Sequence, residues 1–254
     1  MSSVFGNLET AWRSDVGFST LRVDKIVKGS GAPILADPSV AFQFFDDFYT
    51  YDATATVGDY AAVSDGGTVV QTDAAGGVLS VPTGGTDNNE TYISSMAEVF
   101  VFNTTKKLWF EAKINLTEAN TDDANIIVGL SDTVAANSLL DNGAGPMASY
   151  DGAVWFKVDG GTVWQFETSN AGTQVTTASA GTFTSATDYR LGFTYDYQDG
   201  VTGRVVPYLD GVAGAGHDIT ISGLQEMHIL FGAKAGGGNA ETLLVDYVKV
   251  VQER

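Results

Sequence analysis

The stretch LWFEAKINL, residues 108–116, alternates apolar and polar side chains without a break. Successive side chains of a β-strand point to opposite faces, so Leu108, Phe110 and the apolar residues at the next alternate positions share one buried side. Trp109 lies on the other side, together with Glu111. The stretch therefore predicts a strand with one face in a core. Its second face is a binding surface, a contact with another copy, or the underside of a further layer.

Most of the chain has the same pattern of short alternating runs separated by turns rich in glycine. The sequence has 30 glycines and only 5 prolines, which is typical of strands joined by tight connections. We predict strands near residues 42–45, 67–71, 77–81, 91–102 (as two strands), 108–116, 124–131, 153–158, 162–168, 173–177, 189–197, 204–209, 217–221, 227–234 and 241–251. This number favours an all-β, two-sheet antiparallel jelly-roll sandwich over an eight-stranded barrel.

Two local patterns support this prediction. Asp159-Gly160-Gly161 separates AVWFKV from TVWQFET, and glycine accepts the positive φ that a tight hairpin requires. The strand YRLGFTYDY places five large side chains on one face, namely Tyr189, Leu191, Phe193, Tyr195 and Tyr197. A row this apolar belongs to a core or to an interface.

Composition excludes several classes of function. The chain has 254 residues, no cysteine and two distant histidines, so neither a disulfide framework nor a zinc site is expected, and no cofactor is expected. Its formal net charge of -18 argues against nucleic acid and anionic membranes as partners. The first residues lack the pattern of a signal peptide, which predicts synthesis in a host cytoplasm.

Residues 1–40 differ from the rest and form a predicted N-terminal arm, followed by a sandwich over residues 41–254. The arm has four cations and four anions, so the sandwich carries the whole negative excess. A helix over residues 5–12 and a strand over 19–27 are predicted within it. A segment with this many apolar residues and no core of its own packs on its own sandwich or on a neighbouring subunit, and both alternatives stay open.

Motifs for chemistry are sparse. The Glu-x-Asp-x-x-Glu pattern of β-sandwich glycanases and the Gly-x-Ser-x-Gly nucleophile elbow are absent, so the chain is expected not to be an enzyme. The acidic run TEANTDDAN, with Glu118, Asp122 and Asp123, has oxygen ligands suited to calcium, although a solvated turn is favoured. The stretch DNGAGPMASYDG has the content of a sugar-binding loop and equally that of an ordinary surface loop.

Tryptophans on strands offer a candidate glycan platform. Trp109, Trp155 and Lys157 combine indole rings with a nearby polar group, as sugar-binding faces do. The alternative, that these tryptophans are covered by a loop or by the N-terminal arm, is favoured because aromatic residues are ordinarily buried.

The runs FQFFDDFYTYD, LWFEAKINL, NIIVGLSDT, AVWFKVDGG, YRLGFTYDY, RVVPYLDG and LLVDYVKV carry a resemblance to a known family. Over about residues 42–252 the chain resembles the concanavalin A-like lectin/glucanase jelly roll, in the form found in capsid decoration (cement) proteins of tailed bacteriophages.

This resemblance implies a structural virion protein on the capsid surface, bound to the major capsid protein and to itself as a homo-oligomer, expected to be a trimer. The capsid-contact residues of the arm would be Phe5, Trp12, Arg13, Phe18, Arg22, Lys25 and Lys28. The alternative is a carbohydrate-binding module or a host-receptor-binding fibre domain that recognises surface glycans.

Overall fold

The structure is a computed structural model that describes residues 26–27, 33–35, 39–53, 58–72, 74–102 and 105–254. Within the first forty residues it describes a two-stranded antiparallel sheet of β1 (Ile26–Val27) and β2 (Pro33–Leu35). All seven arm residues proposed for capsid contact, and the helix expected over residues 5–12, lie outside the described residues.

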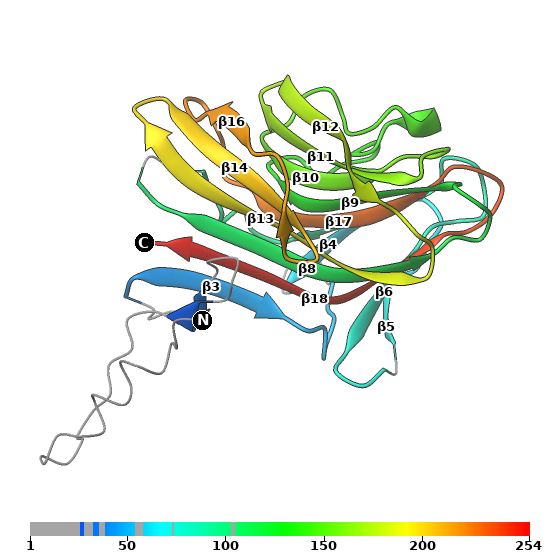
Figure 1. The fold of residues 1–254 in the computed structure, drawn as a ribbon. Coiled ribbons are helices and arrows are strands. Elements are labelled where there is room, and N and C mark those ends of the chain that lie inside the picture. The colour runs from blue at the N-terminus through cyan, green and yellow to red at the C-terminus, as the bar shows by residue number, and fades with distance from the viewer. Residues whose placement is uncertain (1–25, 28–32, 36–38, 54–57, 73, 103–104) are drawn as a thin grey trace, which may run out of the picture.

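Two antiparallel sheets lie one over the other and form a sandwich (Figure 1). The seven-stranded sheet, called the front sheet here, has the order β12-β11-β10-β9-β17-β7-β4. Its strands are β4 (Tyr60–Ser64), β7 (Glu90–Ser95), β9 (Ala124–Ser131), β10 (Gly152–Lys157), β11 (Val163–Asn170), β12 (Thr173–Thr182) and β17 (His228–Ala235).

The nine-stranded sheet, called the back sheet, has the order β15-β14-β13-β8-β18-β6-β5, with β16 paired to β14 and β3 paired to β18. Its strands are β3 (Ala41–Asp46), β5 (Val70–Thr72), β6 (Val78–Pro82), β8 (Leu108–Thr117), β13 (Thr187–Asp199), β14 (Thr202–Leu209), β15 (Val212–Ala213), β16 (His217–Thr220) and β18 (Thr242–Glu253). A single 3-10 turn, Asp141–Gly143, accompanies the described strands, and no described helix is long and apolar enough to span a membrane.

The core lies between the sheets and is built by the predicted alternation. Leu108, Phe110 and the next three alternate residues of β8 are buried, as are Tyr189, Leu191, Phe193 and Tyr195 of the row on β13, while Tyr197 is half-buried. Phe193 stacks on Phe110 with ring centroids 4.9 Å apart. Such offset aromatic pairs add about 0.5–1.5 kcal/mol to the burial of their area. The row on β13 is therefore core, and the prediction of a buried face on both strands is confirmed.

The structure differs from the sequence prediction at several strands, and the short strands β2 and β15 were not predicted. Residues 91–102 hold one strand, β7, instead of two, and beyond it Phe100 forms only an isolated bridge with Met227. Strand β4 was not predicted, because YAAVS alternates small residues that give little periodic signal. The turn at Asp159-Gly160-Gly161 is as expected, with Gly160 at a φ of 70° between β10 and β11.

Candidate functional site

The outer face of the front sheet is covered by the segment that connects β9 to β10. This covering segment, residues 132–151, packs Leu139 and Tyr150 against apolar side chains of the sheet. The sheet residues buried beneath it are Tyr92, Ile127, Val154, Phe156 and Leu230. Strands β7, β9 and β10 are consequently buried on both faces.

Lys234 of β17 fastens the covering segment to the sheet. Its Nζ donates to Asn137 Oδ1 at 2.6 Å and to the Leu139 carbonyl at 2.9 Å, and it pairs with Asp141 at 2.5 Å and with Glu90 at 3.1 Å. The Lys234 side chain is only 1% exposed, so these four oxygens replace its hydration.

A second polar cluster on the same face surrounds Glu167 of β11. Its carboxylate accepts hydrogen bonds from Tyr150 Oη, Gln174 Nε2 and Thr176 Oγ1, at 3.1, 2.8 and 2.5 Å. Burial raises the pKa of Glu167, and these three donors oppose that rise. The clusters around Lys234 and Glu167 thus bind the covering segment and β12 to the front sheet.

The acidic run considered for calcium surrounds an ammonium group instead. Glu118 Oε1 lies 2.7 Å from Lys157 Nζ, which also donates to the carbonyls of Asp122 and Ala124 at 3.2 and 2.9 Å. Among the described residues no group of three or more acidic or histidine side chains is arranged to hold a metal ion. Lys157 supplies the positive charge within the turn.

The predicted glycan platform of Trp109, Trp155 and Lys157 does not form, and this corrects the interpretation from sequence. Trp155 is 1% exposed inside the sandwich, where its Nε1 donates to the Gly192 carbonyl at 2.9 Å, and Lys157 is fully buried. Trp109 lies on the outer face of the other sheet, packed against Ala41 and Val251. Trp155 and Lys157 share the inner face of β10, and Trp109 lies on the outer face of the opposite sheet, so the three side chains form no common surface.

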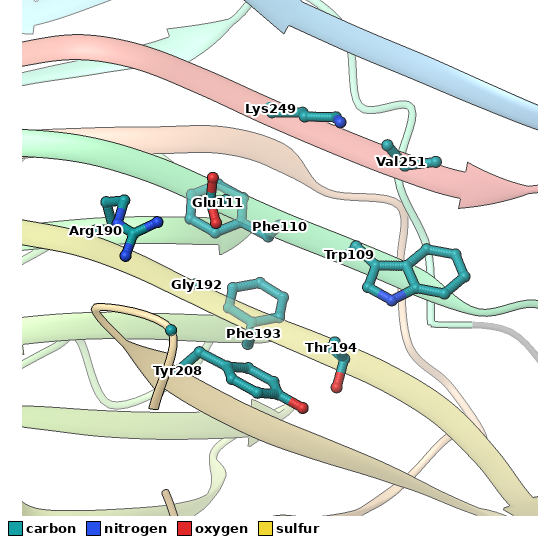
Figure 2. Close-up of a pocket in the computed structure, with 11 residues that line it drawn as sticks. Trp109, Phe110, Glu111, Arg190, Gly192, Phe193, Thr194, Tyr208, Lys249 and Val251 are labelled. Atoms are coloured by element: carbon teal, nitrogen blue, oxygen red, sulfur yellow. The ribbon is translucent and has the colours of Figure 1, made fainter. Parts of the chain in front are cut away.

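The outer face of the back sheet carries a hollow, drawn in Figure 2. Gly192 of β13 forms its floor, because the register places this glycine between Glu111 of β8 and Tyr208 of β14. Trp109 and Val251 lie at one side and Arg190 at the other, and Lys249 lies beside Glu111 on the neighbouring strand. A Cβ at Gly192 would lie 2.9 Å from the Phe110 carbonyl, so the sheet favours glycine there for close packing as well.

The walls of the hollow are held by hydrogen bonds. Glu111 Oε1 accepts from Tyr247 Oη at 2.8 Å, and burial together with this carboxylate raises the pKa of Tyr247. Arg190 Nη2 donates to the carbonyl of Asp210 at 3.1 Å. The hollow therefore combines aromatic surface with a carboxylate and two cations, a composition that can accept an aromatic or sugar ring with polar substituents.

Lys and Arg are distributed unequally between the two sheets. Residues 41–254 contain nine Lys and Arg, and the two on front-sheet strands, Lys157 and Lys234, are both buried. The other seven lie on back-sheet strands or directly beside the ends of β8 and β18, and they are Lys106, Lys107, Lys113, Arg190, Arg204, Lys249 and Arg254. The front sheet thus presents no exposed cation on its strands in a chain of net charge -18.

Strand β3 begins at the same face. Ala41, the first residue of β3, packs on Trp109 and Val251, which line the hollow. The start of β3 therefore lies directly beside the hollow. Sequence reasoning placed Trp109 on the outer side of β8 but missed Arg190, Tyr208 and Lys249, since only the pairing of four strands brings them together.

Comparisons with known proteins identify the fold. No protein-family model and no curated protein matches the sequence. The structure is similar to an endo-1,3-beta-glucanase from Streptomyces sioyaensis, with a TM-score of 0.55 and 14% identity over 86% of this chain and 98% of that chain. It is also similar to the carbohydrate recognition domain of Emp46p, with a TM-score of 0.52 and 12% identity over 82% of this chain and 97% of that one.

A third similar structure is an endo-beta-1,4-glucuronan lyase from Trichoderma reesei, with a TM-score of 0.53 and 12% identity over 82% of this chain and 94% of that chain. At these identities the likeness defines the fold, which is the concanavalin A-like lectin/glucanase sandwich. The resemblance seen in the sequence is confirmed at this level.

The expectation that the chain is not an enzyme is wrong. Two of these three similar structures are enzymes, a glucanase and a lyase, so this sandwich does not exclude catalysis. The expectation relied on the absence of two local motifs, whereas carboxylates from separate strands can meet on a sheet without leaving any local pattern.

Proposed function

We propose that the protein is a structural component of a virion, which decorates the capsid of a tailed bacteriophage and stabilises its shell. It attaches through the outer face of the back sheet together with the N-terminal arm. The unequal distribution of cations is the observation that supports this proposal, because within residues 41–254 all seven Lys and Arg outside the front-sheet strands lie on or beside back-sheet strands. Cations at an interface add specificity and speed association with a partner that carries negative groups there.

The position of the arm supports the same orientation. The arm adds Arg13, Arg22, Lys25 and Lys28 to a segment that is neutral overall, and β3, which follows it, begins beside the hollow. The front sheet then faces outward. The net charge of -18 would keep neighbouring particles apart and would repel anionic cell surfaces.

Quantitative cosedimentation with phage heads that lack the protein tests this proposal. The back-face variant Arg190→Glu/Lys249→Glu is compared with the front-face variant Ala136→Glu/Ala144→Glu, whose substitutions lie at exposed positions of the covering segment. We expect the back-face variant to bind at least about tenfold more weakly, because like charges across an interface are unfavourable. The front-face variant should bind like wild type. Equal binding by the two variants would overturn the proposed orientation, and no binding by wild type would overturn the function.

A second candidate function is carbohydrate binding at the hollow. The observation that favours it is the glycine floor between Trp109 and Tyr208, which leaves room for a ring beside an aromatic face with charged groups around it. The comparison with a carbohydrate recognition domain agrees with this candidate. A glycan array with Tyr208→Ala tests it, with Tyr49→Ala as the control because Tyr49 is 78% exposed elsewhere on the surface. A signal that Tyr208→Ala leaves unchanged would exclude the hollow.

A further inference from the structure

Strand β12 is an edge of the front sheet and pairs on one side only. It joins β11 in the antiparallel register Thr173↔Asn170 to Thr177↔Phe166, and in the described part of the chain no strand pairs with its other side. Figure 1 shows β12 at the end of the front sheet, next to β11. Half of the main-chain N–H and C=O groups of such a strand point outward and can pair with another strand.

The composition of β12 does not protect this edge. TQVTTASAGT contains no charged residue and no proline, and the nearest charges along the chain are Glu167 and Asp188. Proteins commonly protect an open edge with a charge, a proline or a very short strand. The back sheet follows this rule, since β15 and β16 have two and four residues and β3 ends at Asp46.

The first half of β12, residues 173–177, has a regular backbone fixed by its pairing with β11. Thr173 to Thr177 run in continuous register with β11, and the ladder becomes irregular only beyond Thr177. Gln174 and Thr176 donate to Glu167, and the Thr177 hydroxyl lies 2.8 Å from His217 Nε2. A strand fixed in this way loses little conformational entropy when a second strand joins it.

We propose that β12 pairs with β12 of a second copy of this chain, in an antiparallel arrangement centred on Val175. The regular ladder of residues 173–177 is symmetric about Val175, so a two-fold axis there pairs Thr173 with Thr177 of the other copy, and Gln174 with Thr176. The outer edge thereby gains main-chain hydrogen bonds, as in other cases of strand addition.

The uncharged composition of β12 makes this edge suitable for a second copy. Two molecules of net charge -18 repel each other across most of their surfaces, and an uncharged edge of small side chains is a place where they can approach. Val175 is 43% exposed and would be covered by its symmetry mate. A basic partner would instead be attracted to the acidic surfaces elsewhere.

Single-cysteine cross-linking tests the register directly, because the chain has no cysteine of its own. Val175→Cys should form a disulfide-linked dimer under mild oxidation, since a residue on the axis faces itself with Cβ atoms close together. Ser179→Cys and Val212→Cys, both at exposed positions away from the axis, should stay largely monomeric. Equal cross-linking of the three variants, or none at Val175, would overturn the proposal.

Sedimentation equilibrium of the full chain gives an independent measurement. We expect wild type at about 100 µM to contain a species of twice the 26.7 kDa chain mass, and Val175→Lys to weaken that association at least about tenfold through like-charge repulsion. Val212→Lys on β15 adds the same charge at a 72% exposed site and should associate like wild type. A single-chain mass for wild type, or equal association of both lysine variants, would overturn the proposal. Neither outcome depends on capsid binding.

Discussion

Replacing Lys157 by methionine should destabilise the protein more than any other single change of a lysine to methionine in the sandwich, apart from Lys234. The ammonium group lies inside the fold, 2.7 Å from Glu118 and within hydrogen-bond distance of the Asp122 and Ala124 carbonyls. Its Nζ also lies 5.1 Å from the centre of the Phe183 ring. Methionine fills a similar volume but leaves the buried Glu118 carboxylate without its cation.

The magnitude follows from this uncompensated charge. Breaking a buried ion pair by removing one partner costs about 3–5 kcal/mol, because the remaining charge stays out of water. Each kcal/mol lowers the melting temperature of a domain of this size by about 2–4 °C, so Lys157→Met should melt roughly 6–20 °C lower. Changing both partners, as Lys157→Met/Glu118→Gln, should recover much of this loss because no buried charge remains.

Equilibrium denaturation in urea, followed by tryptophan fluorescence, measures the effect. Lys113→Met is the matched control, since Lys113 pairs with Asp246 at 2.7 Å on the surface and its side chain is 33% exposed. An exposed pair of this kind contributes at most about 1 kcal/mol. If Lys157→Met and Lys113→Met lose the same stability, or if the double variant is no better than Lys157→Met, the reasoning from buried charge is refuted.

Three other changes test separate parts of the structure. Burial, aided by the guanidinium of Arg204 and opposed by Asp218, lowers the pKa of His217. The unfolded chain therefore binds more protons than the folded one, and the free energy of unfolding should fall as pH drops below about 6.5. His217→Gln should reduce this fall, as measured by urea titrations at pH 7 and pH 5. Gly129→Ala should lower the free energy of unfolding by more than about 2 kcal/mol, because the added Cβ would lie 2.2 Å from the Ala153 carbonyl oxygen. A Cβ at Gly200 meets nothing within 4 Å, so Gly200→Ala should be nearly neutral in the same assay. Lys234→Met should loosen the covering segment and raise its rate of limited proteolysis about tenfold or more; an unchanged cleavage rate would show that Lys234 does not hold it.

Much of the fold could be predicted from the sequence, because alternation is a local property. The pattern of residues 108–116 identified the buried side of β8, and the apolar row on β13 was correctly expected to be buried. The same signal failed on β10. All six residues from Gly152 to Lys157 are buried, so parity alone could not tell that Trp155 points into the core and that Lys157 carries a charge inside it.

The candidate site depends on contacts that no short stretch of sequence contains. Trp109 and Arg190 are distant along the chain, and the pairing of β8 with β13 brings them to one hollow around Gly192. The sequence by itself determined that this chain forms alternating strands with a strong acidic excess, because both follow from the order and kind of side chains. Only the tertiary structure decided which face is covered, where the exposed cations gather and which edge stays open, because these depend on strand register and on the stacking of two sheets.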